Sequence, residues 1–193
     1  MPVSLAEVER RVMGASRLEL PSRDNRPAAV LIPLREMEPG VAHSPVEILL
    51  TRRAEHLDAH AGQVSFPGGT VDPTDADIFE AALRETHEEL GIAPEAVRVL
   101  GRLDDMLTIT GFHVSPVVGV VEPGVRLEPN PVEVARVFAL PLSVAMDEEA
   151  WEQRLHPWRG SEVTAWHLPY DGEDVWGATG TMLRDFVALL RGR

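Results

Sequence analysis

The chain has 193 residues, 44% of them hydrophobic and 25% charged, with a formal net charge of -13. This length and composition are typical of one domain with a sizeable core, so we expect residues 1–193 to form a single domain. The absence of cysteine excludes disulfides, thiolate catalysis and zinc–thiolate sites. All 18 basic residues are arginine, which excludes a Schiff-base lysine and a phosphate-loop lysine.

Charge and hydropathy also restrict the partners and the compartment. A chain this acidic lacks the basic footprint that binding to a nucleic-acid backbone requires. It contains no apolar run of membrane-spanning length and no signal-peptide pattern, so we expect no membrane partner and a cytoplasmic location. With an anionic substrate, bound cations must offset the repulsive field of the protein, which favours a metal-dependent site. The sequence leaves a homodimer open.

The first third of the chain is predicted to contain one helix and two strands. Ser4 and Glu7 form a capping box at the start of an amphipathic helix over residues 4–13. Residues 28–33 and 46–53 are apolar runs typical of strands, and proline-containing polar segments connect them.

Residues 66–92 contain a glycine-rich turn, a loop and a helix. Asp77 with Glu80 forms a second capping box, and Gly91 supplies the left-handed position that ends the helix. At about 100° per residue, one face carries the core side chains and the opposite face is acidic. The core face has Phe79, Leu83, Thr86 and Leu90, and the acidic face has Glu85, Glu88 and Glu89.

The acidic face of this helix needs a compensating partner. Carboxylates spaced three and four residues apart repel one another, and a hard divalent cation is a partner that suits oxygen ligands. The alternative is a solvated face of ion pairs, for which Arg84 is well placed between Glu80 and Glu88.

The remaining elements alternate along the second half. Strands are expected over residues 97–103, 111–121, 133–140 and 163–170, with Pro116 near the start of its strand or at a sheet edge. Residues 146–155 are predicted to be helical. A last helix opens at residues 174–177, where Trp176 is expected to be a packing anchor, and continues with a core stripe up to Gly192.

Residues 84–92, Arg-Glu-Thr-His-Glu-Glu-Leu-Gly-Ile, resemble the end of the Nudix box, R-E-U-x-E-E-x-G-U with U apolar, which paired glycines precede. Two positions depart from that pattern. Thr86 stands where an aliphatic residue is usual, and Ala76 stands where the box has its first glutamate, in a loop one residue longer than usual. Asp72, Asp75 and Glu80 are the candidates to replace that acid, unless nothing replaces it.

Residues 49–69 carry a second resemblance, to the signature of the coenzyme A pyrophosphatase branch of Nudix hydrolases. That signature is L-L-T-x-R-S/A-x3-R-x3-G-x3-F-P-G-G, and the only departure is Asp58 in place of its second arginine. Arginine binds phosphate oxygens bidentately, and glycine lets the backbone come close to phosphates. For His60 a local hydrogen bond, and for Phe112 a place in the core, are equally good alternatives to a substrate contact. The candidate substrate-binding residues are Arg53, His60, Gly62, Phe66, Gly68, Gly69 and Phe112.

These resemblances imply an α/β (α+β) fold, the Nudix α/β/α sandwich with a mixed sheet. They imply hydrolysis of coenzyme A or a derivative to 3′,5′-ADP and 4′-phosphopantetheine, with Mg²⁺ or Mn²⁺ held by Glu85, Glu88 and Glu89. Arg84 would orient these glutamates, and either Glu85 or Glu133 would be the general base.

Two other functions stay open. One is hydrolysis of another nucleoside diphosphate-X compound, which Asp58 makes plausible. The other is a non-catalytic nucleotide sensor, against which three mutually repelling carboxylates argue.

Overall fold

The computed structural model of the chain describes residues 3–21, 24–36, 45–57, 60–158 and 160–193. In chain order the elements are α1 (Leu5–Gly14), β1 (Arg26–Glu36), β2 (Val46–Arg53), β3 (Val64–Ser65), β4 (Gly68–Thr70), α2 (Ile78–Leu90), the 3-10 turn η1 (Pro94–Ala96), β5 (Val97–Arg102), β6 (Met106–Leu107), β7 (Phe112–Val121), β8 (Val134–Pro141), α3 (Leu142–Ala145), the 3-10 turn η2 (Glu148–Ala150), β9 (Glu152–Trp158), β10 (Ser161–Tyr170), β11 (Glu173–Val175) and α4 (Gly177–Leu190).

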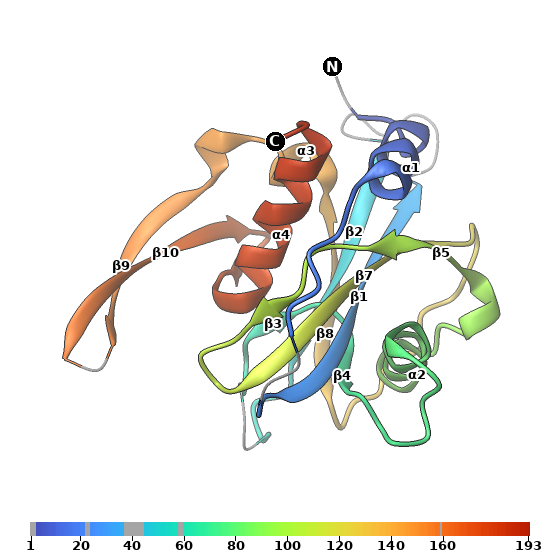
Figure 1. The fold of residues 1–193 in the computed structure, drawn as a ribbon, viewed down its shortest axis with the longest axis horizontal. Coiled ribbons are helices and arrows are strands. Elements are labelled where there is room, and N and C mark those ends of the chain that lie inside the picture. The colour runs from blue at the N-terminus through green and yellow to red at the C-terminus, as the bar shows by residue number, and fades with distance from the viewer. Residues whose placement is uncertain (1–2, 22–23, 37–44, 58–59, 159) are drawn as a thin grey trace.

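Strands β1 to β8 form one mixed sheet (Figure 1). Its main path runs β3-β2-β1-β7-β5, with β4 paired to β1, β6 to β7 and β8 to β2. The central strands β1 and β7 run parallel, whereas the other pairs between described strands of this sheet are antiparallel. Strands β2 and β4, which carry candidate substrate-binding residues, therefore both lie next to β1.

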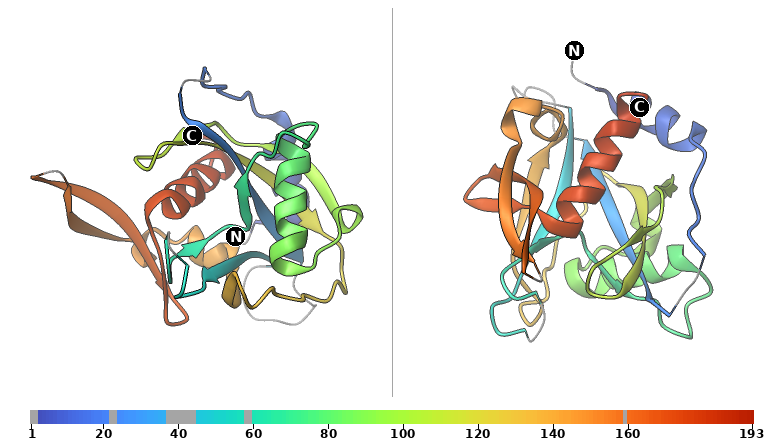
Figure 2. Two further views of the ribbon diagram at one scale, coloured as in Figure 1. Left: turned by 90° about the horizontal axis from the view of Figure 1, so that it is seen from below. Right: turned by 60° about the vertical axis from the view of Figure 1, so that its left-hand side comes forward.

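Helices cover both faces of this sheet. Side chains alternate along each strand, so each strand contributes apolar side chains to both faces. In β1, Ala29 and Leu31 face α2, while Ile32 and Leu34 face the core shared with α1 and α4. Figure 2 shows the sheet between α2 on one side and α4 on the other. The predicted α/β/α sandwich with a mixed sheet is confirmed, and its structural relatives share it.

The predicted elements are mostly found at their expected places. Helix α1 begins after Ser4, whose side-chain oxygen accepts the backbone N–H of Glu7 at 3.3 Å. Strand β1 extends beyond residues 28–33 at both ends, and β2 has the predicted bounds. No helix in the described part of the chain is long and apolar enough to cross a membrane.

Pro116 lies in the middle of β7, which runs between β1 and β5, so its prediction near a strand start or sheet edge is wrong. The strand tolerates the proline because β7 changes its antiparallel partner there, and neither β5 nor β6 pairs with Pro116. Strand β5 ends with Arg102 opposite Val117, and β6 begins with Met106 opposite Val114. The missing N–H of Pro116 falls between these pairings and breaks no ladder bond there.

The helix predicted over residues 146–155 is also wrong. The carboxylate of Asp147 accepts the N–H of Glu149 at 3.0 Å and caps only the turn η2. Trp151 is buried, and its indole N–H donates to the carbonyl of Ala145 at 2.9 Å. From Glu152 onward the chain pairs with β10 instead, so tertiary pairing overrides local helix propensity.

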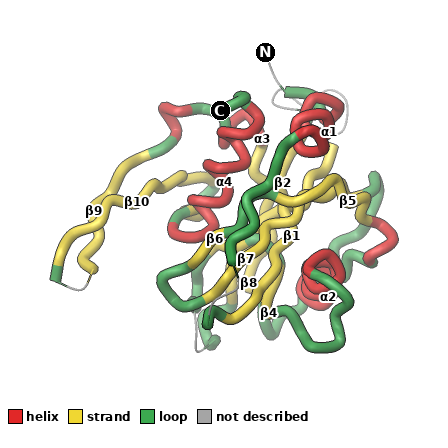
Figure 3. Tube along the Cα trace, viewed as in Figure 1, coloured by secondary structure: helices red, strands yellow, loops and turns green. Residues whose placement is uncertain are grey.

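Strands β9, β10 and β11 form a second sheet, and the β9–β10 hairpin extends away from the sandwich (Figure 3). The rings of His156 and His167 stack on Trp176, with centroids 4.8 and 5.2 Å from the indole. The Nε2 atoms of the two histidines lie 2.7 Å apart, and His167 Nδ1 lies 2.8 Å from a carboxylate oxygen of Asp174. Trp176 is therefore the packing anchor predicted for it, joining this sheet to α4.

Candidate active site

Helix α2 begins and ends at the residues that the sequence indicates. Asp77 Oδ1 accepts the backbone N–H groups of Phe79 and Glu80, both at 2.9 Å. Glu80 in turn accepts the N–H of Ala76 at 2.6 Å. At the other end Gly91 adopts φ 69°, the left-handed conformation that terminates a helix. These caps fix which residues of α2 face the sheet.

Gly68 and Gly69 let α2 approach β4 closely. A Cβ atom on Gly69 would lie 2.5 Å from the carboxyl carbon of Glu85, and one on Gly68 would lie 2.4 Å from the carbonyl oxygen of Ala29. Gly68 also adopts φ 153°, a conformation that favours glycine. The paired glycines therefore make the space in which the glutamates of α2 meet the edge of the sheet.

Glu89 is buried, with 3% of its surface exposed, although it was predicted on a solvent-facing ridge. That prediction is wrong because Glu89 lies on the part of the acidic face that packs against Gly68. The backbone N–H of Gly68 hydrogen-bonds the Glu89 carboxylate. Glu89 Oε2 has no hydrogen-bond partner among the described residues. Burial raises the pKa of Glu89 to about 8, the charges of Glu133 and Glu85 add to this rise, and Arg53 opposes it.

Arg84 ties the loop before α2 to the acidic face. Its Nε and Nη2 atoms donate to the two carboxylate oxygens of Asp75 at 2.9 and 3.0 Å. Nη1 donates to Glu85 at 3.0 Å and to Glu88 at 3.3 Å, and Nη2 also reaches the carbonyl of Thr70 at 3.1 Å. The predicted pairing of Arg84 with Glu85 and Glu88 is present.

Three acids are candidates to replace the missing glutamate of the box. Of these three, Asp75 is the one that pairs with Arg84. The hydrogen bonds from Arg84 hold the pKa of Asp75 below its usual range. Asp72 instead accepts the N–H and hydroxyl of Thr74, and Glu80 accepts the N–H of Ala76. The extra residue in the loop thus moves the paired acid from position 76 to position 75.

Glu133 lies in the turn before β8 and joins the glutamates of α2. Its backbone carbonyl accepts the N–H of Ala54 at 2.8 Å, and its Oε1 accepts an N–H from the side chain of Asn130 at 3.2 Å. Its charge contributes to the raised pKa of both Glu85 and Glu89, for each of which burial is the largest cause. Asn130 orients Glu133, a role that no motif in the sequence indicates.

Arg53 points to the α2 side of β2 and Arg52 to the opposite side. The charge of Arg53 acts on Glu89, whereas Arg52 Nε lies 3.9 Å from a carboxylate oxygen of Glu173. Arg53 Nε is buried without a hydrogen-bond partner among the described residues. The charge of Arg53 therefore acts on the buried carboxylate of Glu89, and at least its Nε is unpaired among the described residues.

The loop after β2 brings two further candidates near Arg53. Gly62 adopts φ 69° and donates its N–H to the carbonyl of Arg53 at 3.2 Å. His60 also has a positive φ, and its Nδ1 lies 2.9 Å from the side-chain oxygen of Gln63, which is the local hydrogen bond left open by the sequence. The signature position Asp58 lies outside the described residues.

The two aromatic candidates differ in exposure. Phe66 is 1% exposed and packs in the core on the α4 side, so the prediction that it contacts substrate is wrong. Its ring anchors the turn that precedes the paired glycines. Phe112 is half-buried against the same core, and the guanidinium carbon of Arg26 lies 5.4 Å from its ring centroid.

The donors of this site fit a hard divalent cation. They are carboxylate oxygens, one of them buried without a partner, and they repel one another. Within the described residues no three histidine, aspartate or glutamate side chains are gathered closely enough to hold a metal ion. Glu85 and Glu88 instead accept hydrogen bonds from Arg84.

Comparison with known proteins finds relatives over most of the chain. The NUDIX domain profile matches residues 24–175. A protein of an Enterobacter species called uncharacterized Nudix hydrolase NudL is 45% identical over 174 residues, covering 86% of this chain and 85% of the relative. The protein of that name from Salmonella paratyphi B is 44% identical over 169 residues, covering 85% and 82%.

Solved structures share the fold. An Ap4A hydrolase binary complex from C. elegans superposes with a TM-score of 0.55 at 20% identity, covering 86% of this chain and 99% of that one. A MutT protein from Methanosarcina mazei Go1 gives 0.53 at 22% identity, covering 89% and 97%. Nudix hydrolases generally use divalent metals such as Mg²⁺ or Mn²⁺. Because the family profile spans most of the chain and the first relative, at 45% identity, covers 86% of it, this protein belongs to the Nudix hydrolase family.

Proposed function

We propose that this Nudix hydrolase cleaves the diphosphate bond of coenzyme A or a derivative, giving 3′,5′-ADP and 4′-phosphopantetheine. The observation that carries this proposal is the meeting of Glu85, Glu89 and Glu133 with Arg53 beside the paired glycines. The choice of coenzyme A is supported by the resemblance of residues 49–69 to the signature of the coenzyme A branch. The acidic residues and the segment suited to phosphate both support a diphosphate substrate.

Glu85, Glu88 and Glu89 would hold Mg²⁺ or Mn²⁺. A bound divalent cation neutralises the oxygens of a diphosphate and lowers the pKa of a water molecule attached to it. Arg84 hydrogen-bonds Glu85 and Glu88 and is itself paired with Asp75, which would restrict the orientations of these two ligands.

A general base must take a proton from the attacking water. Glu133 and Glu85 are the two candidates, and the hydrogen bond from Asn130 keeps the carboxylate of Glu133 in one orientation. The oxygen of the water forms a new bond to one phosphorus, and the bridging P–O bond breaks. The departing phosphate keeps the bridging oxygen and both electrons of that bond.

Substrate binding falls to residues upstream of α2. Arg53 lies on the α2 side of β2, and its Nε, unpaired among the described residues, is suited to non-bridging phosphate oxygens. Gly62, Gly68 and Gly69 let the backbone approach the diphosphate. His60 and Phe112 would contact the more distant parts of this small-molecule nucleotide substrate, and neither lies in the buried core.

A substrate panel tests this proposal. The protein with Mg²⁺ is incubated separately with coenzyme A, an acyl-coenzyme A, NADH, ADP-ribose and a diadenosine compound, and products are identified by mass. We expect the highest kcat/KM for coenzyme A or its acyl derivative, with 3′,5′-ADP as a product. If another compound of the panel is the best substrate, the coenzyme A assignment is wrong. Ligand binding without Mg²⁺ and no cleavage with it would instead indicate a nucleotide sensor.

A further inference from the structure

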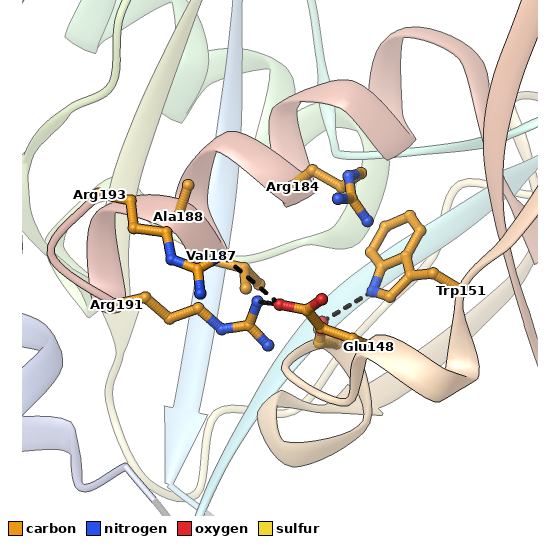
Figure 4. Close-up of a pocket in the computed structure, with 8 residues that line it drawn as sticks. Glu148, Trp151, Arg184, Val187, Ala188, Arg191 and Arg193 are labelled. Atoms are coloured by element: carbon orange, nitrogen blue, oxygen red, sulfur yellow. Dashed lines mark hydrogen bonds and ion pairs between the residues drawn. The ribbon is translucent and has the colours of Figure 1, made fainter.

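A pocket with three arginines lies on the opposite side of the sheet from the acidic site. It is formed between α4, α3 and η2 (Figure 4). We call it the arginine pocket and define it by Glu148, Trp151, Arg184, Arg191 and Arg193. Helix α2 covers the other face of the sheet, so no glutamate of the acidic site lines this pocket.

Arg184 is held in this pocket by aromatic rings rather than by an acid. Its guanidinium carbon lies 4.0 Å from the ring centroid of Trp166 and 5.1 Å from that of Trp151. The hydrogen bond from the indole of Trp151 to Ala145 fixes one of these rings. Arg184 makes no hydrogen bond or ion pair with any residue that the structure describes. Its N–H donors are thus oriented in advance and unused.

The other two arginines share a single carboxylate. Arg191 forms an ion pair with Glu148, and Arg193 Nη1 lies 3.7 Å from the same Glu148 oxygen. The side chain of Glu148 is 61% exposed, so it can turn into solvent. The pocket therefore holds three guanidinium groups and one carboxylate, which contacts only Arg191 and Arg193.

A neighbouring hollow extends this positive surface. Arg193 lines it together with Arg10 and Arg11 of α1, which both pair with Glu7. A local concentration of arginines in a chain of net charge -13 creates a positive potential that attracts small anions. The same net charge opposes approach to an anionic membrane, so the ligand is a soluble compound.

We propose that the arginine pocket binds the phosphate group of a small soluble phosphorylated compound. Guanidinium groups donate paired N–H bonds to phosphate oxygens. Arg184 presents such donors from α4, and Arg191 at the end of this helix would add the Nη1 group that now pairs with Glu148, while its Nη2 stays on the carbonyl of Met146. The phosphate takes the place of the Glu148 carboxylate, which moves into solvent. This site is independent of the diphosphate hydrolysis proposed above.

The test is a titration of the metal-free protein with inorganic phosphate, followed by tryptophan fluorescence, against chloride at equal ionic strength. We expect a saturable change with phosphate alone, because two tryptophan rings flank Arg184. Arg184→Gln should weaken binding about tenfold or more, a typical loss for a charge-assisted contact. Arg98→Gln is the matched control, since Arg98 pairs with Glu9 away from the pocket.

Three further variants distinguish loss of phosphate binding from misfolding. Glu148→Gln removes the competing carboxylate and should tighten phosphate binding, an effect that misfolding cannot produce, whereas Glu149→Gln should not. Arg53→Gln should leave phosphate binding unchanged, because Arg53 lies at the acidic site. Equal effects of phosphate and chloride, undiminished binding by Arg184→Gln, or loss of binding in Arg53→Gln would each overturn the proposal.

Discussion

Arg84 and Asp75 form a two-pronged ion pair, with Nε–Oδ1 and Nη2–Oδ2 distances of 2.9 and 3.0 Å. This pair fixes the guanidinium that in turn binds Glu85 and Glu88. We predict that Asp75→Asn lowers kcat/KM or Mg²⁺ affinity by about 10- to 100-fold, the usual loss when a group that orients metal ligands is removed.

The matched control for this prediction is Asp72→Asn in the same loop. Asp72 accepts hydrogen bonds from Thr74, and the ion pairs of Arg84 with described residues are to Asp75, Glu85 and Glu88, so substitution of Asp72 should change activity far less. Equal losses in the two variants, measured by steady-state kinetics and Mg²⁺ titration, would mean that the loop and not the ion pair matters.

Glu89 makes the stability of the metal-free protein dependent on pH. Burial raises the pKa of Glu89 from 4.5 to about 8. Between these pH values the unfolded chain releases a proton that the folded protein retains. The free energy of unfolding should therefore fall as pH rises from 4.5 to 8.

This prediction is measured by urea unfolding with a chelator present. Glu89→Gln cannot ionise, so relative to wild type it should gain stability as pH rises from 5 to about 8, and the difference should then level off. Glu88→Gln, with a side chain 52% exposed, is the control and should follow wild type. A constant difference between Glu89→Gln and wild type across this range would contradict the raised pKa.

The two adjacent glycines should respond differently to alanine. At Gly69 the added Cβ meets the carboxyl group of Glu85, a side chain that can move, so Gly69→Ala should fold but lose activity. At Gly68 it meets the backbone of Ala29 and Val30 with φ 153°, so Gly68→Ala should lower the melting temperature strongly.

Thermal unfolding and turnover, measured on both variants, separate these effects. Gly14→Ala is a control, because a Cβ there meets nothing within 4 Å. A Gly69→Ala variant with full activity would show that Glu85 does not need its position beside the turn.

Local signals predicted α2 well. The caps at Asp77 and Gly91 depend on neighbours within a few residues, and both are found as expected. The same periodicity misplaced Glu89, because a helical projection shows which residues share a face but not what packs on it. Only the approach of Gly68 from β4 decides that this glutamate is buried.

Long-range contacts decide the other differences. The strand pattern implies that Arg52 and Arg53 face opposite sides, yet only the fold shows that Arg53 faces Glu89. From the sequence alone, Asp75 is one of three candidates for the missing acid of the box, and no local pattern distinguishes it from the other two. Residues 152–158 pair with β10, which local helix propensity cannot indicate.

The most direct test of the acidic site is the turnover of coenzyme A by Glu89→Gln with saturating Mg²⁺. The amide keeps the shape of the side chain but loses the charge that a divalent cation requires. We predict that kcat falls by about 100-fold or more, with the circular dichroism spectrum unchanged, and that Glu88→Gln behaves likewise. Near-normal turnover by both folded variants would contradict the assignment of the α2 glutamates as the metal-binding centre of this hydrolase.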